Sequence, residues 1–147
     1  MSEKSAYLKY RKAIKVFKDR IQRIENLMII GMPDVNQCLE GCECWIEIKS
    51  PKEPKRSTTP LFGSNHKVST EQKNWFLDQK NAGGVGWLLI CTDKRWMLID
   101  GCIYADFVNE MTVDELISIS TYWFALQPNG DVPKMLIKDL RTYLIWK

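Results

Sequence analysis

The chain has 147 residues, of which 45% are apolar and 11% aromatic, enough for a packed core, and this composition excludes general disorder. The net charge is only +3, and no apolar run approaches the roughly 18 residues that a membrane span needs. The first twenty residues contain no uninterrupted apolar core, so we expect no secretory leader. The five cysteines fit free thiols in a reducing cytoplasm better than a disulfide framework. We expect a single domain over residues 1–147.

Charge is distributed unevenly along the chain. Residues 1–25 carry eight Lys or Arg against three acidic residues, whereas residues 100–131 carry six acidic residues and no basic one. A basic end suits a partner that carries phosphate groups, but a solvated helix face would give the same pattern. Charge alone leaves both interpretations open.

The first predicted element is an amphipathic helix. Five apolar residues follow one another at spacings of four, three, four and three, which places them on one helix face: Tyr10, Ile14, Phe17, Ile21 and Ile24. The segment 21–30 is also rich in β-branched residues, which is typical of a strand. We place the change from helix to strand near residue 21.

The clearest local pattern is a predicted β-hairpin. Residues alternate between apolar and polar over 44–49, so a strand here buries one face. Glu40 and Gly41 form the natural turn. With that turn, positions whose numbers sum to 81 lie opposite each other, so Asp34 faces Glu47 on the same side of the sheet.

The rest of the chain is predicted to extend the sheet and then to add helices. Residues 51–69 hold three prolines and indicate a long mobile loop. A second helix is expected to begin near residue 69 or 70 and to end at Gly83-Gly84, before a buried apolar strand over 85–91. The remaining expected elements are edge strands at 95–100 and 102–106, a helix from a Thr112–Glu115 capping box to about Ala125, and a last helix capped by Asp131 that carries Leu136, Leu140 and Leu144.

This element order begins α-β-β-β-α-β. We expect it to form an α/β fold with a core over about residues 21–92. A C-terminal helical extension is expected over about 107–147.

Asp34 and Glu47 form the site that we expect to carry chemistry. Two opposed carboxylates repel each other, and a fold tolerates them readily when a cation lies between them. Their hard oxygen ligands suit Mg²⁺ or Mn²⁺, and the ammonium of Lys49 would stand beside that ion, where it could hold water or offset charge on a phosphate. The alternative is a salt-bridged surface hairpin in which Glu47 pairs with Lys49 or a neighbour.

These residues resemble a known motif. GMPD at 31–34 followed by WIEIK at 45–49 is similar to the active-site signature of the PD-(D/E)xK nuclease superfamily, which lies on a β-hairpin inside an α-β-β-β-α-β core. Three further segments, RIEN at 23–26, TEQ at 70–72 and GGVGWLLI at 83–90, resemble small phage-type members related to Holliday junction resolvases. The resemblance covers the predicted core and implies a restriction-endonuclease-like mixed sheet flanked by helices.

The resemblance implies roles for the hairpin residues. Asp34 and Glu47 would ligate a divalent metal, Mg²⁺ or in its place Mn²⁺, and the backbone carbonyl of Ile48 would be a further ligand. Lys49 would orient or polarise the attacking water.

Two more residues receive a role from the resemblance. Glu25 is the nearest candidate for another carboxylate ligand, although an ion pair with Arg23 or a lysine explains it as well. Gln72 would touch the water, the metal or the scissile phosphate from the start of the second helix, and its alternative is an exposed residue in a first helical turn.

Other chemistries have less support in the sequence. Cys38, Cys42 and Cys44 suggest zinc, but the hairpin register sends Cys38 to the opposite face, so we expect buried thiols. His66 is the only histidine and lies in the Pro-rich loop, where we expect it to be solvated. The serines lack the context of an activated nucleophile, and the glycines within 83–86 do not match a dinucleotide fingerprint, so no nucleotide cofactor is expected.

The sequence therefore predicts a Mg²⁺-dependent DNA endonuclease, with branched DNA such as a Holliday junction as the expected substrate. It is expected to be a cytoplasmic homodimer without a membrane partner, in the host cytoplasm if a phage encodes it. The alternatives are a repair or restriction-type nuclease on ordinary duplex and a non-catalytic DNA-binding module of the same fold. The expected DNA contacts are Lys52, Lys55, Arg56, Lys67, Arg23 and Trp45. The dimer face is expected to be either Tyr10, Ile14, Phe17 and Ile21 or Leu136, Leu140 and Trp146.

Overall fold

The structure is a computed structural model, and it describes residues 2–15, 19–24, 29–63 and 66–145. Glu25, Phe17, Ser64 and Trp146 lie outside these described residues. The elements are, in chain order, α1 (Glu3–Ile14), β1 (Arg20–Arg23), β2 (Val35–Leu39), β3 (Cys42–Lys49), α2 (Thr70–Asn81), β4 (Gly86–Cys91), β5 (Arg95–Asp100), α3 (Gly101–Tyr104), a 3₁₀ turn at Val108–Glu110, α4 (Val113–Ile119), β6 (Tyr122–Ala125) and α5 (Lys134–Ile145).

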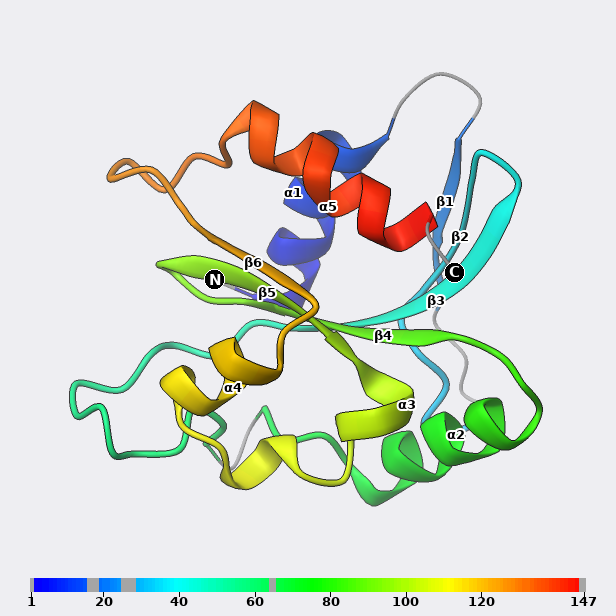
Figure 1. Ribbon diagram of the computed structural model, residues 1–147, viewed down its shortest axis with the longest axis horizontal. Helices are drawn as coiled ribbons and strands as arrows, with labels where there is room; N and C mark the ends of the chain where they lie inside the picture. Colours follow the sequence, from blue (N-terminus) through cyan, green and yellow to red (C-terminus); the bar gives the residue numbers. More distant parts are fainter. Residues whose placement is uncertain (1, 16–18, 25–28, 64–65, 146–147) are drawn as a thin grey trace.

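Within the described residues, six strands form one mixed sheet in the order β1-β2-β3-β4-β5-β6 (Figure 1). The β3 and β4 strands are parallel and are joined through α2, whereas the other neighbours are antiparallel. The element order α1-β1-β2-β3-α2-β4 confirms the predicted α-β-β-β-α-β core and the mixed α/β class. The β4 strand is buried at every residue, as predicted for a strand covered on both faces.

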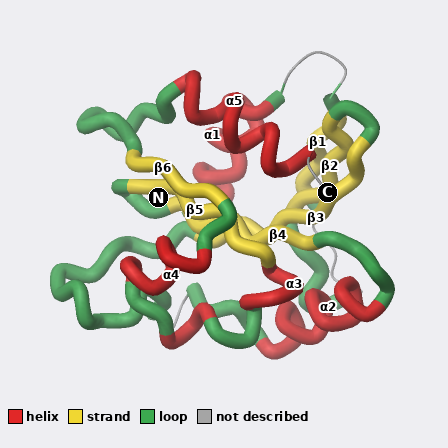
Figure 2. The backbone as a smooth tube through the Cα atoms, in the orientation of Figure 1, coloured by secondary structure: helices red, strands yellow, loops and turns green. Residues whose placement is uncertain are grey.

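Helices cover both faces of the sheet (Figure 2). On one face α1 and α5 pack together over an apolar cluster that includes Tyr10, Ile14 and Leu140. On the other face α2, α3 and α4 cover a second cluster that includes Phe76 and Val68. The sheet therefore separates two cores, and each strand places alternate side chains into one or the other.

The β2-β3 hairpin has the predicted register. Val35 lies opposite Ile46, and the turn residues Glu40 and Gly41 have φ values of 49° and 81°. Two consecutive positive φ values are typical of the tight turn whose twist matches that of the flanking strands. This turn fixes which side chains of β3 face α2, so it also fixes the geometry of the candidate site.

The end of the first helix was predicted wrongly. Helix α1 ends at Ile14 rather than near residue 21, because Lys15 is extended and Arg20 already pairs with Cys38 of β2. Ile21 is therefore buried from a strand. The hydrogen bonds of the sheet outweigh the helical spacing of the apolar residues.

Three predictions in the C-terminal third were also wrong. Residues 102–106 do not form a strand, because the Asp100 side chain accepts from the Cys102 N–H and starts α3. The Thr112–Glu115 capping box is confirmed, but its helix ends at Ile119 and β6 follows, paired with β5. The predicted helical extension therefore contains a strand of the main sheet.

The third correction concerns Asp131, which does not cap α5. Its carboxylate accepts instead from the side chain of Asn129, and the N–H groups of Leu136 and Ile137 in the first turn of α5 donate to the carbonyl of Pro133. Helix α5 begins at Lys134, after this turn.

The predicted loop 51–69 packs against the protein rather than extending freely. Leu61, Phe62 and Val68 are buried in the second cluster. The backbone of Val68 exchanges two hydrogen bonds with the side chain of Asn109.

In the described parts of the chain, no helix is both long and apolar enough to cross a bilayer.

Most of the described residues of the two predicted dimer faces are buried within the chain. Tyr10, Ile14, Ile21 and Leu140 lie in one buried cluster, whereas Leu136 is partly buried and Phe17 and Trp146 lie outside the described residues. Helices α1 and α5 therefore cover each other within one chain.

Candidate active site

Asp34 and Glu47 lie opposite each other at the base of the hairpin, as the register predicts. The Asp34 N–H donates to Oε2 of Glu47 at 3.2 Å. Glu47 is only 1% exposed and Asp34 is half-buried. Two carboxylates thus share one partly dry site on the α2 face of the sheet.

Two side chains hold the other oxygen of Glu47. The Lys49 ammonium lies 3.4 Å from Oε1, and the Gln72 amide donates to the same oxygen at 2.5 Å. Lys49 is only 6% exposed, so its charge acts in a poorly solvated place. Lys49 and Gln72 therefore both lie beside the Glu47 carboxylate.

Helix α2 positions Gln72 through its own N-terminal cap. The Ser69 hydroxyl accepts from the Gln72 N–H, and Oε1 of Gln72 accepts from the Ser69 N–H at 2.9 Å. This capping box leaves the Gln72 amide nitrogen to donate to Glu47. Gln72 therefore links the start of α2 to the carboxylate pair, and it is not merely an exposed residue of a first turn.

Gly31 allows the chain before Asp34 to approach α2 closely. Its φ is +89°, and a Cβ added here would lie 2.3 Å from the carbonyl oxygen of Glu71. Only glycine fits this contact without a shift of backbone. The loop that leads into Asp34 and the helix turn that carries Gln72 are therefore fixed against each other.

The electrostatics of the site favour a bound cation. Burial, together with the charge of the neighbouring Asp34, raises the pKa of Glu47 to about 8, although Lys49 opposes the shift. Burial also raises the pKa of Asp34, against the opposing effects of Lys49, Arg23 and the N–H of Ile48. A positive charge between the two carboxylates would relieve both burial and repulsion.

Glu3 is a carboxylate near the site, and the sequence reasoning missed it. It lies in the first turn of α1, and its charge raises the pKa of both Asp34 and Glu47. No local motif marks it, because it comes 31 residues before Asp34. The only signal in the sequence is the pattern of a capping Ser2 followed by an acidic first turn, which fits any helix start.

The predicted ligand Ile48 has a suitable backbone orientation. Its N–H bonds to Asp34, and the carbonyl of a strand residue points to the same edge as its N–H. Its side chain is buried on the opposite face. Glu25, the other predicted ligand, lies outside the described residues.

The predicted DNA contacts surround the site unevenly. Lys52, Lys55, Arg56 and Lys67 are exposed on the 51–69 loop. Trp45 lies on the carboxylate face, as the hairpin parity predicts, and packs on Trp75 of α2 with ring centroids 5.6 Å apart. Arg23 lies over the Tyr7 ring, and its charge reaches Asp34.

The competing metal reading, a zinc site, has no geometric support. Cys38 pairs with Glu43 and so lies on the opposite face from Cys42 and Cys44, as predicted. All five thiols are free, and Cys44 accepts a hydrogen bond from Gln37. Cys44 is buried as expected, whereas Cys38 and Cys42 are only partly buried.

The donor set fits Mg²⁺ or Mn²⁺. Across residues 2–15, 19–24, 29–63 and 66–145, no three His, Cys, Asp or Glu side chains gather into a ready metal cage. Magnesium commonly binds through one or two carboxylates and completes its shell with water and substrate phosphate. Asp34 and Glu47, with the Ile48 carbonyl, supply that kind of incomplete oxygen set.

His66 differs from the solvated loop histidine that the sequence suggested. It is partly buried, and its Nδ1 lies 4.0 Å from Oε1 of Glu3. It also lines a cavity beside Ser50, immediately after Lys49. The loop therefore brings His66 beside Glu3 and near Ser50, from seventeen residues after Lys49.

No protein-family model and no curated protein matches the sequence of this chain. Among solved structures, the chain is similar to the Holliday junction resolvase Hjc of Archaeoglobus fulgidus, an archaeal hyperthermophile. The two share 16% sequence identity, with a TM-score of 0.49 over 93% of this chain and 96% of that chain. A likeness of this size says nothing about individual residues, so the site is judged on its own geometry.

Proposed function

We propose that this chain is a divalent-metal-dependent nuclease that hydrolyses phosphodiester bonds in DNA. One observation carries the proposal: Glu47 is almost fully buried, opposed to Asp34 and held by Lys49 and Gln72. A fold that needed only a stable hairpin would gain by replacing this cluster with apolar residues. A cluster of this kind is typical of a site that binds cations and handles phosphate.

Each residue of the cluster has a task in this hydrolysis. Asp34, Glu47 and the Ile48 carbonyl would hold the ion, Mg²⁺ or Mn²⁺, and Glu3 adds negative charge near them. When bound, such an ion supplies Lewis-acid charge and lowers the pKa of water. Gln72 keeps the Glu47 carboxylate in place through its amide.

Lys49 provides positive charge where the reaction develops negative charge. Its ammonium is nearly buried and sits beside Glu47, so it needs little reorganisation to face a phosphate. Its role is to orient water and to stabilise the phosphate as bonds form and break. This interaction strengthens in the transition state, so it serves rate more than binding.

The exposed cations of the 51–69 loop would hold the DNA backbone. Lys52, Lys55, Arg56 and Lys67 follow the strand that carries Glu47 and Lys49. Contacts of this type bind phosphates without reading bases. They suit an enzyme that recognises the shape of DNA.

We further propose a four-way junction as the preferred substrate and a homodimer as the active species. Each chain offers one carboxylate pair within its described residues, whereas resolving a junction requires two matched incisions. A two-fold dimer would present two such sites to a substrate that is itself nearly two-fold symmetric. The protein would work in the cytoplasm, where DNA and Mg²⁺ are both present.

The test is a cleavage assay with purified protein, Mg²⁺ and matched junction, flap, nicked and linear DNAs. We expect cleavage that requires the metal and is fastest on the junction. Glu47→Gln should abolish it, whereas Glu43→Gln, an exposed carboxylate on the same strand, should not. Fastest cleavage of linear duplex would indicate a repair or restriction-type nuclease. DNA binding without cleavage under Mg²⁺ or Mn²⁺ would indicate a non-catalytic module and overturn the proposal.

A further inference from the structure

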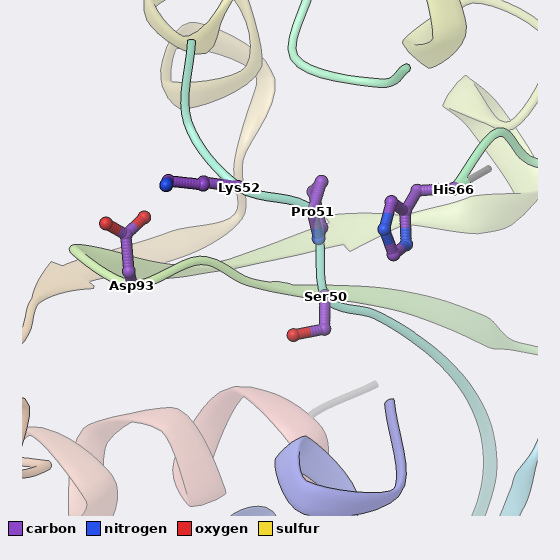
Figure 3. Close-up of a pocket in the computed structure, with 5 residues that line it drawn as sticks. All are labelled: Ser50, Pro51, Lys52, His66 and Asp93. Atoms are coloured by element: carbon purple, nitrogen blue, oxygen red, sulfur yellow. The ribbon is translucent and has the colours of Figure 1, made fainter. Parts of the chain in front are cut away.

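A cavity of about 330 Å³ opens beside the end of β3. Its lining residues come from three separate segments: Ser50, Pro51, Lys52, His66 and Asp93 (Figure 3). Successive strand residues rise by about 3.3 Å, so the Ser50–Lys52 wall lies within about 10 Å of Lys49. The cavity is therefore a neighbour of the carboxylate cluster and not a part of it.

His66 presents an incompletely used imidazole to this cavity. Its Nδ1 is shielded from solvent and has no hydrogen-bond partner among the described residues, although Oε1 of Glu3 lies 4.0 Å away. An imidazole always carries at least one N–H donor. With Nδ1 turned toward Glu3, the other ring nitrogen is the one available to a ligand.

The Ser50–Lys52 wall of the cavity is held rigidly. The Ser50 hydroxyl donates to the Cys91 carbonyl at 3.1 Å. Glu53 is nearly buried, and its Oε1 accepts from Arg95 at 2.7 Å and from the Thr92 hydroxyl at 2.9 Å. These contacts tie the segment around Lys52 to the β4-β5 turn, so the cavity is formed before any ligand arrives.

The charges around the cavity select the class of ligand. Lys52 and His66 both line the cavity, on either side of Pro51, and the Lys52 side chain extends toward Asp93 (Figure 3). An ammonium and an imidazole on one cavity wall can both donate to an anion with several acceptor oxygens. Duplex DNA carries one phosphate per about 3.4 Å of axis on each strand, so a cavity within about 10 Å of Lys49 lies within about three phosphates of the cut.

We propose that this cavity is a second phosphate site, which binds a backbone phosphodiester within about three positions of the scissile one through Lys52 and His66. The site deepens the proposed function and rests on it for its biological meaning. It would fix the position of the strand along the cluster, because one held phosphate sets where its neighbour lies.

Asp93 provides a further test of the proposed phosphate site. Its carboxylate lies on the same side of the cavity as Lys52 and opposes any anion there (Figure 3). The negative charge of Asp93 therefore repels a phosphate that binds in this cavity. Removal of this one negative charge should tighten phosphate binding, which a merely structural Asp93 would not do.

The test uses the fact that His66 is the only histidine of the chain, so its imidazole gives a single set of NMR signals. The full-length protein is titrated in EDTA with the dinucleotide TpT and with its neutral methylphosphonate analogue. We expect a saturable shift of the His66 signals with TpT alone. No shift, or equal shifts with both compounds, would overturn the phosphate site.

Three variants complete the experiment. Lys52→Ala should weaken TpT binding about tenfold, the effect of one lost charge-assisted hydrogen bond, and Asp93→Asn should strengthen it. Lys94→Ala is the matched control, because Lys94 is exposed beside Asp93 but does not line the cavity, and it should leave the titration unchanged. An Asp93→Asn variant that binds no better would contradict the assignment of the cavity to an anion.

Failure of this site and failure of the nuclease proposal give different results. A shift of the His66 signals in a protein that cleaves no DNA would support the phosphate site and contradict the proposed nuclease function. Metal-dependent cleavage without a His66 shift would support the nuclease function and contradict the phosphate site.

Discussion

At the scale of single residues, the candidate site combines charges whose burial and mutual repulsion destabilise the metal-free protein. Glu47 is buried beside Asp34, and Lys49 and Gln72 offset only part of that burial and repulsion. The positions of these four residues could be predicted from the sequence, because the hairpin turn, the strand alternation and a capping box are all local features. Glu3 and His66 could not, since long-range packing brings them there.

Asp34→Asn and Glu47→Gln should both abolish cleavage, because each removes a metal-binding charge at nearly constant volume. Without metal, Asp34→Asn should stabilise the fold by about 1 kcal/mol through relief of repulsion on Glu47. Glu47→Gln should be near neutral, because relief of the same repulsion is offset by loss of the partner of Lys49. Chemical denaturation in EDTA measures the change in stability, and a cleavage assay with Mg²⁺ measures the loss of activity. Near-normal turnover in either variant would contradict the assignment of the active site.

Lys49→Ala should reduce the single-turnover rate roughly 100-fold, with a much smaller effect on the Mg²⁺ concentration needed for half-maximal cleavage. The reason is that the ammonium acts on the charge that develops in the transition state. Lys73→Ala, which removes a lysine of α2, serves as the control for loss of a positive charge. A loss of activity that saturating Mg²⁺ fully restores would contradict this role.

At the scale of elements, the start of α2 is fixed against the loop that enters β2. Gly31 lies against the backbone of Glu71, one residue before Gln72. Helix α2 therefore contributes to the site through its position as well as through its amide.

Gly31→Ala should destabilise the protein by about 2 kcal/mol and slow cleavage strongly, because the added Cβ must push α2 and Gln72 away from Glu47. Gly41→Ala is a matched control: its φ is also positive, but nothing lies within 4 Å of the added Cβ. Gly41→Ala should lower the free energy of unfolding, but the folded fraction of this variant should cleave DNA at the wild-type rate. Equal cleavage by both variants would show that the Gly31 contact does not position the site.

The 51–69 loop carries the second prediction at this scale. Lys52→Ala, Lys55→Ala and Arg56→Ala combined should lower the slope of log Kd against log salt concentration by roughly 2 to 3 units, because three phosphate contacts are lost. Fluorescence anisotropy with labelled DNA, measured without divalent metal, gives that slope. The matched comparison is the triple replacement of Lys9, Arg11 and Lys12, which are exposed on α1. It shows whether the loop or α1 contributes more phosphate contacts. An unchanged slope in the loop variant would remove the loop from the interface.

At the scale of the whole molecule, the sheet brings together segments that are far apart in the chain. The end of β3 meets the start of α2, where Gln72 donates to Glu47, and the charge of Glu3 in the first turn of α1 acts on Glu47. The sequence could predict the core strands, whose apolar runs are long and buried on both faces. It could not predict β6, because a four-residue edge strand has too little pattern and forms only by pairing with β5.

The last prediction concerns assembly on DNA. Sedimentation of the protein with a four-way junction should show two chains per junction, since each chain supplies one site and two strands must be cut. The contact must use a surface other than the α1 and α5 stripes, because Tyr10, Ile14 and Leu140 are buried within one chain. Mixing wild-type and Asp34→Asn chains should convert paired cuts into single nicks, whereas a monomer on the junction that still makes paired cuts would overturn the dimer and leave the nuclease standing.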